Sequence, residues 1–208
     1  MTGARGGPRS RKGTRTRTRL LEAAQAVFEE RGYQDTRVSD IAEAADLSHA
    51  SFYHYFDSKE QVFRELAEHH EAQLTAPAEP DDESARPDVS ELAKLWRANR
   101  LYLERYGAAG HFMGVIEEVS RYDDQVNATR IQRQKHFAER AERSIRRLQD
   151  AGLADPAVDA ELAALALGSM VGRFAELWLV EGWGDYELDH AADQITRLWA
   201  NAIGLREA

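Results

Sequence analysis

The chain has 208 residues, of which 43% are hydrophobic and 30% are charged, with no cysteine and a formal net charge of −9. This composition allows one large or two small soluble domains and excludes disulfides, thiol nucleophiles and zinc sites built from cysteine. We find no apolar run near the roughly 20 residues of a membrane span and no signal peptide, so we expect a cytoplasmic protein with no membrane partner.

The net charge is unevenly distributed along the chain. Residues 1–19 contain seven Arg and Lys and no Asp or Glu, a local charge of +7 that leaves −16 for the rest. Because salt screens exposed charges beyond about 8–10 Å, a basic segment on an acidic body can still bind phosphate. Residues 1–14, rich in Gly, Arg, Ser and Thr, are expected to form a disordered basic arm.

Hydrophobic periodicity predicts an all-α protein of about nine helices, without strand patterns. In the N-terminal part, the expected helices cover about Thr16–Arg31, Arg37–Ala45, His49–Phe56 and Ser58–Leu74. Gly32 suits the end of the first of these helices, while Thr36 and Ser48 suit the starts of the next two. We therefore assign residues 15–62 to a helix-turn-helix domain.

Residues 75–88 contain three prolines and many acids, which predicts a linker. Longer helices follow, over about Val89–Tyr106, around Phe112–Val119, and over Asp124–Ala151, Asp155–Glu181 and Leu188–Ile203. The proline after Asp155 favours a helix start there, because proline suits the first helical position. Residues 63–208 form the second predicted domain.

The two short helices centred on Asp40–Phe56 suggest a helix-turn-helix whose second helix enters the major groove of DNA. One side of that helix would pack inward through its aromatic residues, Phe52, Tyr55 and Phe56. The opposite side would face bases with small or polar residues, Ala50, Ser51 and His54. Tyr53 and Lys59 are better placed for phosphates. The same pattern also suits an ordinary helix pair in an all-α core, and a basic arm is often only a solvated tail.

These residues resemble the signature of the TetR family of transcriptional regulators. The similarity is carried by TRVSDIAEAADLS at 36–48 and FYHYFDSKEQV at 52–62, and it extends over about Arg15–Leu66. Together with the basic arm, the resemblance implies DNA contacts by Arg15, Arg17, Arg19, Thr36, Arg37, Ser39, Ser48, His49, Ala50, Ser51, Tyr53, His54, Tyr55 and Lys59. Asp46 stands where the family has a turn glycine. We expect slight strain there, because Asp adopts a left-handed backbone less readily than Gly.

Members of this family also have a variable C-terminal domain that binds a small molecule and dimerises, which implies both roles for residues 63–208. Ligand pockets are mostly apolar with a few polar groups. The predicted ligand-binding residues are Trp96, Asn99, Tyr102, Tyr106, His111, Phe112, Met113, Ile116, Phe137, Met170, Phe174 and Trp178. Candidate polar anchors are Asn99, His111, Arg173 and Glu176. Ordinary core packing is the alternative for each of these residues.

Residues 163–179 are apolar nearly all round, so the helix that contains them needs two packing partners. One partner would be its own domain and the other a second copy of the chain, in a two-fold four-helix interface. The predicted dimer interface comprises Leu165, Gly168, Gly172, Ala175, Leu179, Ile195, Leu198 and Trp199. Which face of the helix lines the pocket and which forms the interface stays open.

No catalytic motif points to an enzyme, and no cofactor or metal site is expected. The cluster from Glu68 to Glu71 is more simply explained as a solvated helix face than as a metal site. We expect a homodimeric repressor that binds double-stranded operator DNA and is released by a small hydrophobic effector, with activation instead of repression left open. The alternative is a helical lipid or ligand carrier, or an enzyme, with an incidental basic arm.

Overall fold

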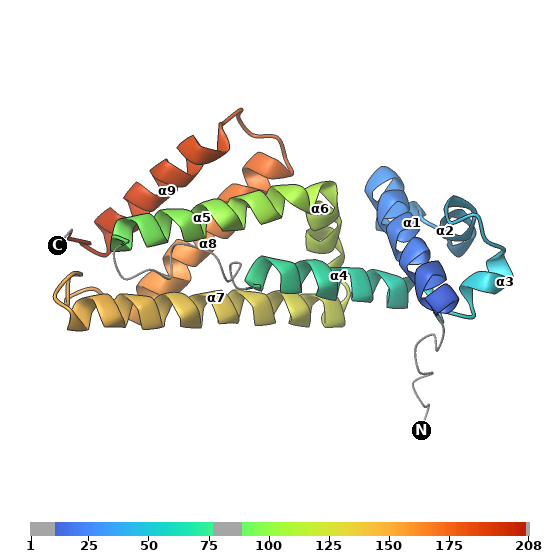
Figure 1. The fold of residues 1–208 in the computed structure, drawn as a ribbon, viewed down its shortest axis with the longest axis horizontal. Coiled ribbons are helices and arrows are strands. Elements are labelled where there is room, and N and C mark those ends of the chain that lie inside the picture. The colour runs from blue at the N-terminus through green and yellow to red at the C-terminus, as the bar shows by residue number, and fades with distance from the viewer. Residues whose placement is uncertain (1–10, 77–88, 207–208) are drawn as a thin grey trace, which may run out of the picture. The chain divides into compact units, whose positions relative to one another are not determined.

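The computed structural model describes residues 11–76 and 89–206, and Figure 1 shows their arrangement. The described residues form nine α-helices and no strand, which confirms the predicted all-α class. The helices are α1 (Arg11–Asp35), α2 (Val38–Ala44), α3 (His49–Phe52), α4 (Lys59–Thr75), α5 (Glu91–Ala108), α6 (Gly110–Val119), α7 (Asp124–Asp150), α8 (Ala160–Leu179) and α9 (Leu188–Ala202). They divide into an N-terminal unit, residues 11–70 with 114–127, and a C-terminal unit, residues 71–76, 89–113 and 128–206.

The N-terminal unit extends beyond the predicted boundary at residue 62. It includes α4 as far as residue 70 and also takes in residues 114–127, from α6, the following turn and the start of α7. Arg64 on α4 pairs with Asp123 at 2.9 Å, and the rings of Tyr33 and Tyr122 lie 6.2 Å apart. These contacts join segments that are distant in the sequence, so local periodicity could not reveal them.

Helix α1 begins earlier than the sequence predicted. Residues 11–14, which were expected to be disordered, are helical, and residues 1–10 of the predicted arm lie outside the described residues. The expected inward face of α1 is buried, through Leu20, Ala24, Val27 and Phe28. Gly32 interrupts the helix as predicted, with φ 76° and ψ 168°, a conformation that essentially only glycine adopts without strain.

The turn after α2 has the left-handed residue that the sequence led us to expect. Asp46 has φ 51°, the only positive φ of a non-glycine residue in the ranges that the structure describes. The Asp46 N–H bonds to the Glu43 carbonyl at 2.9 Å, and the Leu47 N–H bonds to the Ala42 carbonyl at 2.9 Å. This pair of bonds is the Schellman arrangement, which normally places glycine at the left-handed position.

Replacing Asp46 with glycine is therefore expected to raise the free energy of unfolding by about 0.5 kcal/mol. Glycine removes the left-handed penalty of roughly 1–2 kcal/mol, and the greater entropy of the unfolded glycine chain offsets part of this gain. Urea denaturation measures the difference, with Asp46→Ala as the control that should lower stability. A glycine variant less stable than the alanine variant would contradict this account.

Helix α3 is shorter than predicted, because its last turn tightens. The α-helix covers His49–Phe52, whereas the sequence suggested that it continues to Phe56. The His54 N–H bonds to the Ser51 carbonyl, and the Tyr55 N–H bonds to the Phe52 carbonyl, both with i→i−3 spacing. Such bonds form a tighter turn than the α-helix, and Tyr53 and His54 in this turn are exposed.

In the C-terminal unit, α5 packs mainly against α9 and also contacts α8. The Asn99 side chain donates to Thr196 Oγ1 at 3.1 Å, and both residues are buried between α5 and α9. Helix α7 runs antiparallel to α5, because Arg147 pairs with Glu91 near one end and Phe137 meets Tyr102 further along. Hydrogen bonds from Arg147 and Lys94, with their positive charges, lower the pKa of Glu91 to about 2.

Helix α8 differs from the sequence prediction in two respects. It begins at Ala160 rather than near Asp155, because the Asp159 carboxylate accepts the N–H groups of Glu161 and Leu162 and caps the helix. It is also long and apolar enough to cross a membrane by length and composition, contrary to the expectation that the chain has no such run. Most of α8 is not buried within the chain, so its apolar surface needs a further explanation.

Candidate functional site

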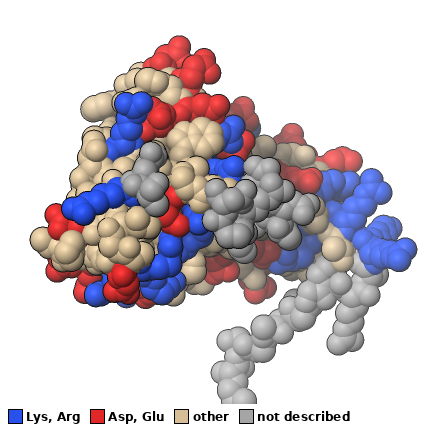
Figure 2. All heavy atoms as spheres, turned by 60° about the vertical axis from the view of Figure 1, so that its left-hand side comes forward, with Lys and Arg blue, Asp and Glu red and all other residues tan. Residues whose placement is uncertain are grey.

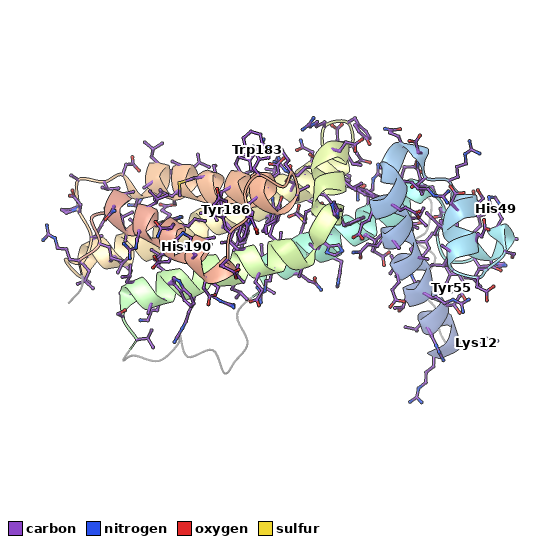
Figure 3. All side chains as sticks on the ribbon, turned by 90° about the horizontal axis from the view of Figure 1, so that it is seen from above. Lys12, His49, Tyr55, Trp183, Tyr186 and His190 are labelled. Carbon is purple, nitrogen blue, oxygen red and sulfur yellow. The ribbon has the colours of Figure 1, made fainter. Side chains whose placement is uncertain are left out.

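The segment from Ser48 to Tyr55 presents small and polar side chains outward from an aromatic base. Phe52 and Phe56 are buried with their rings 5.8 Å apart, which confirms the predicted packing side. The exposed side chains include His49, Ala50, Tyr53 and His54, while Ser51 and Tyr55 are half-buried. Figure 3 shows His49 and Tyr55 on this segment. Its surface therefore offers a small apolar side chain beside hydroxyl and imidazole groups.

Capping and ring contacts hold this segment in place. The Ser48 hydroxyl accepts the Ser51 N–H at 3.1 Å, as expected of an N-cap residue, and lies 2.7 Å from the Ser51 hydroxyl. The rings of His49 and Tyr53 meet edge to face at 5.1 Å. Ser48 thus supports the helix, and Ser51 is the hydroxyl closer to the predicted base-facing side.

The start of α2 contributes a cation and a hydroxyl at the surface. Arg37 and Ser39 are exposed, and the Arg37 N–H donates to the Asp40 carboxylate at 2.9 Å. Thr36, which was predicted to contact DNA, is buried and donates its hydroxyl to the Gly32 carbonyl at 2.7 Å. The Thr36 side chain therefore closes the end of α1 and does not face solvent, which corrects its predicted role.

The arginines of α1 fall into two groups. Arg15 and Arg19 are exposed, as phosphate contacts require. Arg17 instead forms a two-pronged ion pair with Glu65 of α4, and its guanidinium lies 4.7 Å from the centre of the Phe56 ring. Arg17 thereby joins α1 to α4 and to the turn after α3, a structural task in place of the predicted DNA contact. In Figure 2, Lys and Arg side chains gather on the right-hand part of the view, over the N-terminal unit.

Lys59 also has partners within the protein. Its ammonium donates to the carbonyls of Tyr33 at 2.7 Å and Thr36 at 2.8 Å, approaches the Gln34 carbonyl at 3.5 Å, and lies 4.4 Å from the Tyr33 ring centre. A lysine has three donors, so a phosphate contact by this side chain would require breaking these bonds. The structure therefore gives Lys59 the role of closing the α1–α2 connection.

Tyr33 anchors the same connection from its aromatic ring. The ring stacks on Phe28 at 5.6 Å, and the hydroxyl donates to Glu60 Oε1 at 3.3 Å. Burial, reinforced by the Glu60 charge, raises the pKa of Tyr33, so the phenol stays protonated and able to donate. Lys59, Tyr33 and Glu60 thus support the connection between α1 and α2 from inside the N-terminal unit.

The predicted ligand-binding residues do not form one set in the structure. Tyr106, Phe112, Met113 and Ile116 are fully buried, but Ile116 belongs to the N-terminal unit. The remaining aromatic rings form two clusters: Tyr102 with Tyr106 and Phe137, and Phe174 with Trp178 and Tyr186. Trp96 and Met170 are half-buried. Tyr186, which the sequence did not single out, completes the second cluster from the loop before α9 (Figure 3).

The proposed polar anchors of a ligand site are already engaged or exposed. Asn99 donates to Thr196, and His111 is exposed. Arg173 is exposed and pairs with Glu176 at 2.7 Å and with Glu181 at 3.0 Å.

Two ionisable side chains near the end of α4, those of His70 and Glu71, are buried, contrary to the sequence prediction. The cluster from Glu68 to Glu71 was expected to be a solvated face, but only Glu68 and His69 are exposed. His70 donates from Nε2 to Gln25 Oε1 at 3.1 Å, and burial lowers the pKa of His70. Glu71 pairs with Arg133 of α7. Helical phase could have signalled this burial, because His70 and Glu71 continue the spacing of Leu66, Ala67 and Leu74 on the buried side of α4.

Most of the predicted dimer interface faces the chain's own core. Ala175, Ile195 and Trp199 are buried within the single chain. A side chain at Gly172 would meet the Tyr102 hydroxyl at 3.6 Å, and Leu179 lies beside Gly107 of α5. Gly168 is half-buried, and Leu165 and Leu198 stay exposed together with Leu162. The outward face of α8, marked by Leu162 and Leu165, therefore includes Leu165 of the predicted positions but not Ala175.

Comparisons with known proteins identify sequences and structures that are similar to this chain. Residues 20–66 match the sequence model of "Bacterial regulatory proteins, tetR family". The chain is 50% identical over 50 residues to the transcriptional repressor KstR2 of Rhodococcus jostii, 24% of each chain. It is 27% identical over 195 residues to the transcriptional regulator TtgR of Pseudomonas putida, covering 84% of this chain and 90% of TtgR.

The similarity in structure extends over both units. The regulator FadR of Bacillus subtilis, solved in complex with stearoyl-CoA, has a TM-score of 0.70 at 18% identity, covering 89% of this chain and 98% of FadR. At that identity the likeness concerns the fold. Two curated relatives that are 49% and 50% identical to this chain, by contrast, are matched over about a quarter of their own length.

Proposed function

Because the chain belongs to the TetR family of bacterial transcriptional regulators, we propose that it represses transcription by binding operator DNA as a homodimer. The observation that carries this proposal is the surface from Ser48 to Tyr55, which is capped, supported by buried aromatic rings and exposed at the small and polar positions. Two such surfaces in a dimer would enter successive major grooves, about 34–36 Å apart.

Within that surface, we assign base contacts to Ala50, Ser51 and His54. Ala50 can touch a thymine methyl, and hydroxyl and imidazole groups can bond base edges. Phosphate contacts fall to the exposed cations Arg15, Arg19 and Arg37, with Tyr53 and the exposed hydroxyl of Ser39 beside them. His49 and Tyr55 flank the contact surface, and Ser48 caps the helix.

Ser51→Ala and His54→Ala are each expected to change which base is preferred at one operator position, by roughly 1–3 kcal/mol, since base contacts carry sequence discrimination. Arg15→Gln is expected to weaken binding to all sequences and to reduce the slope of log affinity against log salt by about 0.9. Anisotropy titrations against single-base operator variants measure both effects. Equal loss of discrimination in all three variants would refute the division of roles.

The exposed face of α8 supports the dimeric state. Leu162 is 65% exposed and Leu165 56% exposed, and Leu198 of α9 is 54% exposed. Large apolar surfaces of this kind mark interfaces in proteins that fold in water. We therefore place the two-fold interface on this outward face, and the membrane-like composition of α8 reflects burial on two sides.

The effector is proposed to be a small hydrophobic molecule bound in the C-terminal unit. The aromatic cluster of Tyr102, Tyr106 and Phe137 supplies apolar surface there. A structurally similar regulator was solved with stearoyl-CoA. To release the operator, the effector must bind the DNA-incompetent conformation more tightly, because a ligand with equal affinity for both shifts nothing.

A titration of the full chain against DNA from its own upstream region tests the proposal. We expect saturable binding that depends on sequence and weakens with salt, and release of that DNA on adding effector. The alternative of a lipid carrier or an enzyme predicts no sequence preference. Binding that is insensitive to both sequence and salt would therefore overturn the regulatory function.

A further inference from the structure

A buried ion pair lies between α4 and α7 in the C-terminal unit. Arg133 Nε lies 2.8 Å from Glu71 Oε2 in an ion pair, and the two side chains are only 6% and 3% exposed. Apolar residues of the same unit, including Leu74, Phe112 and Met113, are buried as well. The pair is therefore a rare charged feature in an interior that is otherwise made largely from apolar side chains.

Stability alone does not account for this pair. Removing two charges from water costs about as much as their attraction returns, and well-packed apolar residues of similar volume are often at least as stable. Such a pair does, however, link the arrangement of the two helices to a contact between charges. It is also a contact that another anion can replace, because a guanidinium binds any carboxylate in the same planar geometry.

We propose that Arg133 is the anchor for the carboxylate of an amphiphilic effector, which displaces Glu71 from it. This inference rests on the proposed function, since it names the chemistry of the effector. The apolar chain of the ligand would lie along the neighbouring aromatic side chains. Phe137, one turn after Arg133 on α7, packs edge to face on Tyr102 at 5.3 Å, and Tyr102 adjoins Tyr106 at 5.9 Å.

The displacement would reach the DNA-binding surface through α4. Lys59–Thr75 is one helix, in which Glu71 directly follows His70, and His70 donates to Gln25 of α1. A Glu71 carboxylate that is displaced from Arg133 loses a charged partner in a buried setting, which favours a shift of this side chain toward water. That shift favours a new position of the α4 C-terminal turns, whereas the intact pair favours the DNA-competent one.

Direct binding tests the site without DNA. Decanoate is titrated into the full chain by calorimetry below its micelle-forming concentration, with decan-1-ol and decylamine as neutral and cationic probes of equal length. We expect decanoate to bind at least about tenfold more tightly than either. Arg133→Gln should abolish this preference, and Glu71→Gln should strengthen decanoate binding about tenfold, because the competing charge is gone. Arg140→Gln, an exposed arginine of the same helix, should behave as wild type.

The double variant Glu71→Gln with Arg133→Gln covers the case in which Arg133→Gln alone unfolds, since it removes both charges of the pair. It should fold and bind decanoate no better than decan-1-ol. Decanoate binding unaffected by the loss of Arg133, or decan-1-ol binding equal to decanoate in the wild type, overturns the proposal.

An operator titration separates this proposal from the function on which it rests. Decanoate should release operator DNA from the wild type, and Glu71→Gln should need about tenfold less decanoate for the same release. If no operator is bound but the decanoate preference depends on Arg133, the repressor function fails and the anion site stands. If the operator is bound and decanoate binding ignores Arg133, the anion site fails and the repressor function stands.

Discussion

Replacing Leu165 with glutamate is expected to convert the protein into a monomer and to lower its operator affinity at least about a hundredfold. Leu165 is 56% exposed on the outward face of α8, one turn from Leu162, which is 65% exposed. A carboxylate in the centre of an apolar interface would lose its hydration without gaining a partner. Operator affinity falls as well, because a monomer engages one half-site in place of two.

Sedimentation velocity measures the first effect of the Leu165 change, and anisotropy with a full operator measures the second. The matched control is Ile131→Glu, which places the same charge on an exposed apolar residue of α7, outside the proposed interface helices α8 and α9. That variant should stay dimeric. A dimeric Leu165→Glu variant, or a monomeric Ile131→Glu variant, would move the interface to another face.

Replacing Lys59 with methionine is expected to lower the free energy of unfolding by about 3 kcal/mol. The ammonium donates two short bonds, to the carbonyls of Tyr33 and Thr36, and lies over the Tyr33 ring. Hydrogen bonds from a charged donor contribute roughly 1.5–3 kcal/mol each, and methionine keeps the apolar stem but leaves the carbonyls without this partner. Urea denaturation of the wild type and the variant gives the difference.

The salt dependence of operator binding separates this structural role from a phosphate contact. At a temperature where Lys59→Met is folded, its slope of log affinity against log salt should match that of the wild type. Arg15→Gln should show the opposite behaviour, with unchanged stability and a smaller slope. A Lys59→Met variant with wild-type stability and a reduced slope would restore the phosphate contact suggested by the sequence.

Features that depend on neighbours a few residues apart could be predicted from the sequence. Ser48 caps α3, Gly32 interrupts α1 and Asp46 takes the left-handed position, because each is decided by bonds within one turn of the backbone. The inward side of the α3 segment followed from helical phase, since Phe52 and Phe56 are one turn apart and lie opposite Ala50 and His54. Helix ends were less accurate, as at Asp155, because competing caps differ little in energy.

Roles that depend on distant partners were decided only by the tertiary structure. Arg17, Lys59 and Glu71 each look like exposed surface charges in the sequence, and each is held by a group far along the chain. The faces of α8 were undetermined for a related reason. Its residues are apolar nearly all round, so periodicity gives no preferred side. Packing against α5 and α9 turns Ala175 inward and leaves Leu165 outside. Helical phase predicts the buried face of a helix only where polar and apolar residues lie on different faces. Where all faces are apolar, packing against the neighbouring helices determines which face is buried.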